Sequence, residues 1–403
     1  MNLIQQIPVF VVITLIKVAV VLGIYMTTLA YLQWVERKVI AHVQVRMGPS
    51  RVGPHGLLQP LADVIKLITK EGLLPPHVNV FFYLLAPFLA VCMALISISI
   101  IPFGNEITLF GYTTWLQLTD LNVGLLFILA VSSLGVYGIA IAGWSSNNKY
   151  SLLGGLRSSA QMISYELPMS LAIAAPLLML GTLSLREISK AQEGYYFGFL
   201  PHWIVFQGPF PQIVSFVLFL IAAFAETNRI PFDLPEAENE LVAGFHTEYS
   251  SMGFAAFFMA EYANMITVSC VATVLFLGGW TPLFPVSLGS NYVAPLIFAL
   301  AGAIALYHGL NPARKLDRYT LPVVAIVFFG LAVLFAIPVV QEALMSVFWF
   351  CAKAGFLLFA FIWIRATLPR FRYDQLMSFA WKFMFPAALL NLLGTGLMVA
   401  LFS

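Results

Sequence analysis

Residues Ala225–Tyr249 read AETNRIPFDLPEAENELVAGFHTEY and connect two long apolar runs of the chain. This stretch holds six of the 18 acidic residues but only one basic residue, Arg229. The six are Glu226, Asp233, Glu236, Glu238, Glu240 and Glu248. Carboxylates gathered between apolar runs, in a chain of which only 9% is charged, indicate proton chemistry at a membrane.

The composition of the whole chain is that of an integral membrane protein. Of its 403 residues 61% are hydrophobic, and so few charged residues cannot cover a soluble surface of that size. No cluster of basic residues interleaved with aromatics indicates nucleic-acid binding. We therefore expect a single polytopic membrane domain over residues 1–403 and no nucleic-acid partner.

Ten apolar runs approach the length of roughly 20 residues that crosses a bilayer core. They cover residues 8–33, 81–101, 123–143, 165–185, 212–228, 254–277, 293–309, 320–341, 347–366 and 380–402. The predicted fold is therefore all-α, a bundle of about ten transmembrane helices.

The distribution of lysine and arginine predicts how this bundle lies in the membrane. Loops rich in these residues tend to lie on the cytoplasmic side. With the N-terminus outside, most basic residues fall in inner loops, and Arg186 and Lys190 are the two in outer loops. An even number of spans then places both termini on the outer, periplasmic face of a bacterial inner membrane. The acidic loop, residues 229–253, is expected on the cytoplasmic side.

The longest predicted inner loop, residues 34–80, contains a second structured element. Glycine and proline break regular structure at residues 48–56, and apolar residues then recur at helical spacing from Leu57 to Ile68. A helix of about 15 residues is too short to cross a bilayer, so we expect it to lie in the interface plane or over a cavity mouth. A plain membrane-surface helix is the alternative.

Ionisable residues inside the spans are costly to bury, and so they are candidates for function. Glu261 lies about seven residues into the sixth run, and Glu166 is expected at the start of the fourth. Neither has a basic neighbour within a helical turn, which favours a proton path. Glu226 and Arg229 are three residues apart, a spacing that places both on one helix face. They could form an interfacial ion pair or belong to the same path.

Two lysines, Lys17 and Lys353, also fall inside apolar runs. Both are close enough to the outer half of the membrane for their ammonium groups to reach polar surroundings. Structural and functional interpretations of these two residues therefore remain equally open.

Within the acidic stretch, Pro235 follows shortly after Asp233, a good start for a short helix that carries Glu236 and Glu240. Like charges four residues apart repel, and repulsion or burial raises the pKa of a carboxylate. Such a helix could therefore hold protons near neutral pH. A solvated acidic loop is the alternative, although its many apolar residues disfavour it.

The sequence contains none of the usual motifs for electron-carrying cofactors. It has neither of the glycine-rich nucleotide patterns, and its three cysteines are isolated within apolar runs. We therefore expect this chain to bind no flavin, iron–sulfur cluster or metal. We also expect no catalytic residues, and no complete active site, on this chain alone. If redox chemistry occurs, a partner protein must bring the electrons.

Four long phrases resemble one family. They are QWVERKVIAHVQVRMGPSRVGPHGLLQPLADVIKLITKE (33–71), LRSSAQMISYELP (156–168), AETNRIPFDLPEAENELVAGFHTEYSSMGFAAFFMAEY (225–262) and RATLPRFRYDQLMSFAWKFMFP (365–386). They are similar to the H subunit of the proton-pumping NADH:quinone oxidoreductase, respiratory complex I, and to the mitochondrial NADH dehydrogenase subunit 1. The resemblance covers most of the chain.

This resemblance implies a subunit that forms part of the quinone chamber and couples quinone reduction to proton translocation. Quinone would be its substrate. Its partners would be other membrane and peripheral subunits, including the one that carries the terminal iron–sulfur cluster, and the lipid bilayer. The residues implied at the quinone chamber and its access route are Glu36, Arg37, Arg46, Asp63 and Glu71. Those implied in an acidic funnel for protons are Glu166, Glu226, Arg229, Asp233, Glu236, Glu238, Glu240, Glu248 and Glu261.

The chain departs from the family pattern in one respect, since the family usually has eight spans. Residues 293–341 are expected to form an inserted helical hairpin, and a pair of helices leaves the sidedness of the other loops unchanged. Its expected place is at the periphery, against lipid or a neighbouring subunit.

Three other functions are compatible with parts of the sequence. The equivalent membrane subunit of a related hydrogenase or ferredoxin-linked complex would share the architecture and differ in its electron donor. A free-standing ion transporter would show internal repeats and paired broken helices, which the sequence lacks. A purely structural anchor would have no use for the buried acids.

Overall fold

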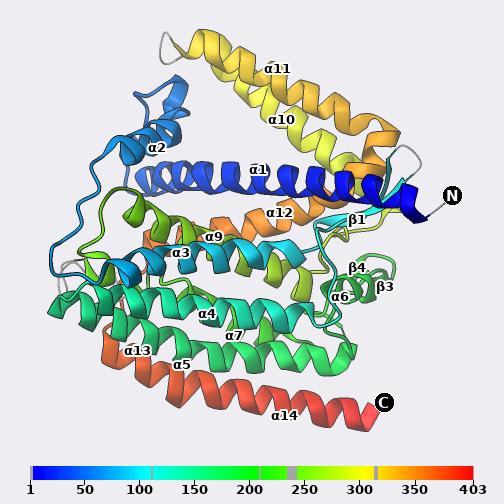
Figure 1. Cartoon of the computed structure of the whole chain (residues 1–403). Helices are drawn as coiled ribbons and strands as arrows, with labels where there is room; N and C mark the ends of the chain where they lie inside the picture. Colours follow the sequence, from blue (N-terminus) through cyan, green and yellow to red (C-terminus); the bar gives the residue numbers. More distant parts are fainter. Residues whose placement is uncertain (1–2, 110–111, 208–209, 234–242, 313–315, 403) are drawn as a thin grey trace.

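Long apolar helices make up most of the structure, a computed structural model that describes residues 3–109, 112–207, 210–233, 243–312 and 316–402 (Figure 1). The helices are α1 (Leu3–Val43), α2 (Gln59–Thr69), α3 (Val80–Ser97), α4 (Gly124–Ser145), α5 (Lys149–Leu180), α6 (Leu185–Ala191), α7 (Ile213–Glu226), α9 (Ser251–Phe276), α10 (Ser290–Leu310), α11 (Asp317–Ala336), α12 (Pro338–Thr367), α13 (Tyr373–Phe379) and α14 (Phe385–Phe402). Within these residues nine helical segments are long and apolar enough to cross a membrane, and α7 is a shorter apolar helix of 14 residues. The predicted all-α polytopic fold is confirmed.

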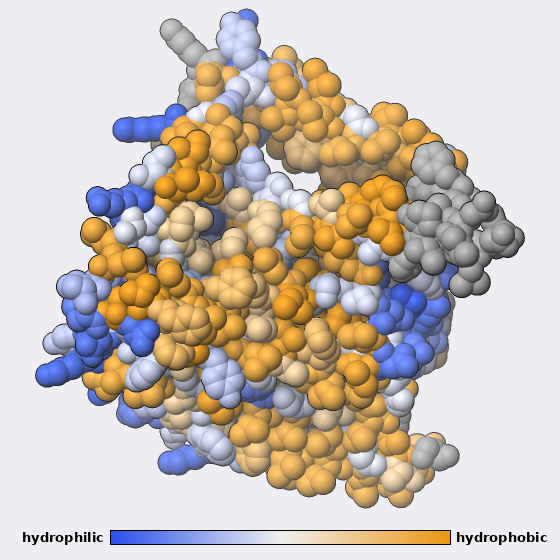
Figure 2. Space-filling model, in the orientation of Figure 1, coloured by the Kyte–Doolittle hydropathy of each residue, from blue (hydrophilic) through white to orange (hydrophobic). Residues whose placement is uncertain are grey.

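Helix α9 lies at the centre of the bundle and contacts α1, α3, α7 and α12. Small residues on α9, such as Ala260, Ala263 and Ala272, are buried. Small side chains let membrane helices approach closely and gain van der Waals contact. Apolar side chains cover most of the face shown in Figure 2, as expected for a surface in contact with lipid.

Several helices differ from their predicted bounds, such as α12, which begins at Pro338 and not at residue 347, and two of these differences concern the site. Helix α5 begins at Lys149, so Glu166 lies in the middle of a 32-residue helix and not at the start of a span. The polar residues before Glu166 lower the hydropathy of this part of the sequence, but Ser158, Ser159 and Gln161 are buried in the bundle. Helix α1 continues past residue 33 to Val43 and carries Glu36 and Arg37 within it.

Both chain termini lie at the same end of the bundle, as an even number of spans requires, and α2 lies at the opposite end (Figure 1). The end with the termini also carries two small antiparallel hairpins that the sequence did not predict. They consist of β1 (Gly104–Leu109) with β2 (Tyr112–Leu116) and of β3 (Tyr195–Tyr196) with β4 (Leu200–Pro201).

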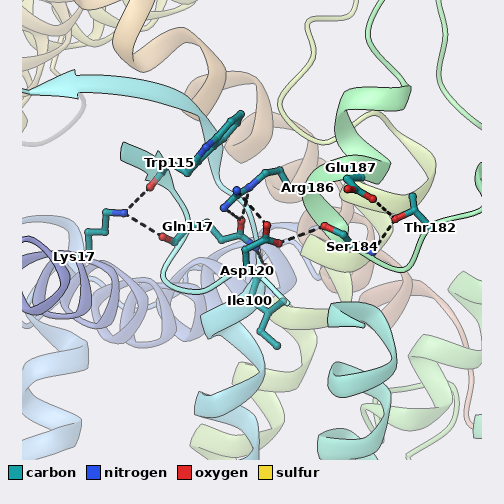
Figure 3. Close-up of polar contacts among 9 residues, drawn as sticks. All are labelled: Lys17, Ile100, Trp115, Gln117, Asp120, Thr182, Ser184, Arg186 and Glu187. Atoms are coloured by element: carbon teal, nitrogen blue, oxygen red, sulfur yellow. Dashed lines mark hydrogen bonds and ion pairs between the residues drawn. The ribbon is translucent and has the colours of Figure 1, made fainter. Parts of the chain in front are cut away.

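Lys17 fastens α1 to the first hairpin (Figure 3). Its ammonium donates to the carbonyl oxygens of Trp115, at 2.8 Å, and Gln117, at 3.4 Å. The Gln117 side chain in turn accepts from Nη2 of Arg186 at 2.9 Å, and Arg186 pairs with Asp120 at 3.1 Å. These bonds tie α1, the hairpin and the start of α6 together, which favours a structural role for Lys17.

Lys353 has the same kind of environment on α12. Its ammonium donates to the carbonyl oxygens of Leu277, at 2.6 Å, and Thr281, at 2.8 Å, and lies 4.8 Å from the centre of the Trp203 ring. It satisfies backbone acceptors just beyond the end of α9. Its contacts likewise favour a structural role.

Helices α10 and α11 form a hairpin that packs against α12 at its base and extends along the bundle towards α2 (Figure 1). Ala294, Met345 and Trp349 form a separate small core at that base. At the other end Nε2 of His55 lies 3.2 Å from Oδ1 of Asp317, the first residue of α11. The hairpin is thus held at its two ends.

Candidate functional site

Charged side chains are buried at the end of the bundle where α1, α9 and α12 meet the segment after α7. Glu36 on α1 accepts from Nη1 of Arg229 at 3.3 Å and forms a second ion pair with Arg365 on α12. The guanidinium of Arg229 also lies 4.1 Å from the centre of the Tyr262 ring on α9, within range of a cation–π interaction. Glu36, Arg229 and Arg365 are called the arginine–glutamate site below.

The segment that leads from α7 into the acidic loop is held by the rest of the bundle. Nε2 of Gln161 donates to the carbonyl oxygens of Ala225, at 2.8 Å, and Phe232, at 2.6 Å. Asp233 is buried and accepts from Nη2 of Arg370 at 2.9 Å. Residues 225–233 are therefore fixed from two sides, by α5 and by the segment between α12 and α13.

Three glutamates from three helices come close together next to this segment. Glu226 and Glu261 line one cavity of about 30 Å³, which has room for about one water molecule. Glu166 interacts electrostatically with Glu226 and accepts a hydrogen bond from the hydroxyl of Ser133 on α4. Glu166, Glu226 and Glu261 are called the carboxylate cluster below.

The carboxylate cluster brings together groups that can share a proton. Buried carboxylates at close range repel each other when both are ionised, and a proton on one of them relieves the repulsion. A water molecule in the shared cavity would bridge Glu226 and Glu261, since both line it. Residues 226–228 line the same cavity, and the next residue, Arg229, contacts Glu36. The carboxylate cluster and the arginine–glutamate site are therefore neighbours.

Glu248, near the other end of the acidic stretch, has a different set of partners. Its side chain accepts from Nδ2 of Asn148 at 2.6 Å, and its carbonyl oxygen accepts from the Tyr83 hydroxyl at 2.8 Å. The rings of Tyr83 and Tyr249 stack at 4.1 Å. Burial lowers the pKa of the nearby His246 to about 4, so this histidine is neutral at pH 7. These contacts bind the stretch to α3 and to the start of α5.

The residues implied at the quinone access route lie around α1 and α2. Nη1 of Arg37 pairs with Asp63 at 2.8 Å, which joins the two helices. Nε of Arg46 donates to Oε1 of Gln44 at 2.8 Å, and Glu71 is exposed just past the end of α2. Apolar side chains of α2, including Leu61 and Ile65, are exposed, as expected of a helix in the membrane interface.

The structure thus divides the fourteen predicted site residues into groups. Glu36, which the resemblance implies at the quinone chamber, pairs with Arg229 from the acidic funnel. Glu236, Glu238 and Glu240 lie outside the described residues, as does the short helix predicted to carry two of them. The placement of Glu226 and Arg229 on one helix face is wrong, because α7 ends at Glu226 and Arg229 turns towards α1.

Four residues of this region had no predicted role. Arg365 and Arg370 pair with Glu36 and Asp233, while Gln161 and Ser133 bond to the acidic segment and to Glu166. The two arginines belong to the phrase RATLPRFR at the end of a span, where basic residues are common for reasons of topology alone. Only the tertiary structure distinguishes them from ordinary interfacial arginines.

The fold and these buried ion pairs define a polytopic helical membrane protein with ionisable groups concentrated at one end. Residues 16–396 match the family described as NADH dehydrogenase. The chain is 68% identical to an H subunit of the NADH-quinone oxidoreductase of Solibacter usitatus, over 97% of this chain and 98% of the relative. It is also 50% identical to an H subunit of the same enzyme from Koribacter versatilis, over 98% and 99% of the two chains. The chain belongs to the NADH dehydrogenase family, and the resemblance identified from the sequence is confirmed.

Proposed function

We propose that this chain is the membrane subunit of a proton-pumping NADH:quinone oxidoreductase that forms part of the quinone chamber and couples quinone reduction to proton translocation. The names of its relatives support the assignment to that complex. The observation that carries the coupling role is the direct contact between Glu36 and Arg229, which joins a residue implied at the quinone chamber to the segment that lines the glutamate cavity.

Quinone is the substrate in this proposal, and partner subunits deliver the electrons. Reduction of a quinone to the quinol takes up two electrons and two protons, so negative charge forms in the chamber until protons arrive. The arginine–glutamate site responds to such charge, because Arg229 and Arg365 are attracted to a new anion and Glu36 is repelled by it. Any movement of Arg229 changes the field at Glu226, three residues away in the chain.

The carboxylate cluster then responds to this change in the electric field. A change in the field at Glu226 alters how readily the cluster binds a proton, and Glu166 and Glu261 offer two further positions for it. A change of three units in one carboxylate pKa corresponds to about 4 kcal/mol. Moving one charge against about 180 mV costs about the same. One buried carboxylate that changes its environment can therefore drive about one proton.

The test is Glu226→Gln in the assembled complex, with Glu106→Gln as a matched control. Glu106 is an exposed glutamate on β1 at the opposite end of the bundle. We expect Glu226→Gln to lower both NADH:quinone reductase activity and proton uptake into proteoliposomes at least tenfold, while native gels show normal assembly. The control should retain both activities. Full activity of Glu226→Gln, together with full activity of Glu166→Gln and Glu261→Gln, would refute the coupling role.

A further inference from the structure

The hairpin formed by α10 and α11 stands away from the bundle between its two points of attachment. Its base packs on α12, and near its other end Oδ1 of Asp317 lies 3.2 Å from Nε2 of His55 in the segment after α1. Figure 2 shows the molecule hollowed between the hairpin and the rest of the bundle. In a membrane this space is open to lipid.

Two cavities border the start of α11, and Asp317 lines both of them. The first, of about 600 Å³, lies at the end of α1 and is lined by Lys38, His42, Arg46 and His55. Among the described residues that line it are Lys38 and Arg46 and one carboxylate, Asp317, so an anion would be favoured in this cavity. Nε of Arg46 donates to Gln44, which uses one of the five N–H donors of its guanidinium.

The second cavity, of about 470 Å³, has a different character. Ala301, Ile304 and Ala305 of α10 and Leu321 of α11 form its apolar wall. An apolar wall of this kind would take a hydrocarbon chain. The two cavities are neighbours through Asp317, so one molecule with an anionic head and an apolar tail would fill both.

We propose that these two cavities form a binding site for an anionic phospholipid, with its phosphate among Lys38, Arg46 and the two histidines and an acyl chain along α10. The first cavity lies at the end of a membrane span, the depth at which phosphate groups of a bilayer lie. Cationic side chains at this depth favour an anionic head over the uncharged head of a quinone. The apolar wall favours a lipid over free phosphate.

The bound lipid would have a position next to the quinone access route. Lys38 follows Arg37, whose partner Asp63 joins α1 to α2. A lipid held here fixes the distance between the hairpin tip and the end of α1, since it contacts both. The hairpin would thus act as a clasp that retains one lipid beside this access route.

The experiment measures which phospholipid stays with the intact complex after delipidation and re-addition. Complex in neutral detergent would be mixed with phosphatidylglycerol, with phosphatidylcholine or with inorganic phosphate, and the bound molecules identified by native mass spectrometry. We expect phosphatidylglycerol to be retained in preference to phosphatidylcholine. Lys38→Gln should weaken its retention about fivefold, the effect of one basic residue at a membrane surface. Lys149→Gln, which removes an exposed lysine at the start of α5, should leave retention unchanged.

A second pair of variants tests the acyl-chain cavity without changing charge. Ala305→Leu should fill that cavity and lower retention, whereas Ala303→Leu, at an exposed position of α10 outside the lining, should not. Equal retention of both phospholipids, or unaltered retention in Lys38→Gln and Ala305→Leu, would overturn the proposal. Displacement of phosphatidylglycerol by inorganic phosphate would indicate a site for a free anion, and displacement by added quinone a quinone site. Either result would also overturn it.

Discussion

The arginine–glutamate site allows a prediction about stability that depends on burial and geometry. In Glu36→Gln the carboxylate is replaced by a neutral amide of the same size, so Arg229 and Arg365 lose a shared counter-charge. The side chains of Glu36 and Arg229 are only 4% and 6% exposed, and that of Arg365 is 24% exposed. Water can therefore screen Arg365 in part but hardly reaches Arg229.

Removing one partner of a buried ion pair typically costs about 3 to 5 kcal/mol, because the other charge remains buried. We take about 3 kcal/mol for Glu36→Gln, since Tyr262 still offers a cation–π contact to Arg229. This corresponds to a factor of roughly 100 in the equilibrium between folded and unfolded subunit. The double variant Glu36→Gln with Arg365→Gln removes one unpaired cation, and it should be more stable than Glu36→Gln alone.

The assay is the temperature at which purified complex loses this subunit, followed on native gels for each variant. The order expected is wild type, then the double variant, then Glu36→Gln as the least stable. Asp374→Asn is a suitable control, because Asp374 pairs with Arg372 at 3.8 Å but both side chains are more than 70% exposed. If Glu36→Gln were as stable as this control, or if the double variant were less stable than Glu36→Gln, the electrostatic account of the site would be refuted.

Two further predictions concern the packing of the acidic stretch. In Gly154→Ala the new Cβ would lie 2.7 Å from the Cα of Gly244, so α5 must shift and assembly should suffer by about 1 to 3 kcal/mol, whereas Gly355→Ala, with nothing within 4 Å, should assemble normally on native gels. For His246, burial lowers the pKa to about 4 from 6.5, so between these two values the unfolded chain binds a proton that the folded chain does not. The contribution of His246 to the free energy of unfolding should therefore fall by about 3 kcal/mol as pH drops from 6.5 to 4 and stay constant above 6.5. His246→Phe should make the heat stability of the complex less dependent on pH between these values, and an unchanged profile in the variant would contradict this account.

The fold could be predicted from the sequence because apolar runs have the length of a bilayer crossing. The same hydropathy signal failed at α5, where Ser159 bonds to the carbonyl oxygen of Gly155 in its own helix and Gln161 bonds to the segment that begins at the end of α7. A window of sequence measures how polar a residue is and cannot measure whether the backbone of its own helix or of another segment satisfies it. The two small hairpins at the end with the termini were missed for a related reason, since they are short and are held by contacts such as that between Lys17 and Trp115.

The candidate site was predictable in its residue types and less so in its pairings. Carboxylates in and between spans are costly, and this cost alone identified Glu166, Glu226 and Glu261. Their convergence on one small region depends on the packing of α5, α7 and α9, which no local pattern encodes. The partner of Glu36 could not be predicted for the same reason, because Arg229 is 193 positions away in the chain.

Residues Ala225–Tyr249 began as an unusual run of acid, and the structure gives its two described ends different roles. The end that begins with the last residues of α7 is buried. It contributes Glu226 to the carboxylate cluster, and its Arg229 pairs with Glu36. The other end is fixed by aromatic stacking and by hydrogen bonds to Glu248. The contacts at each described end oppose a shift of that end when the charge near Glu36 changes. In the proposed mechanism such a change therefore acts through the few side chains between Glu36 and Glu226, and coupling depends on them.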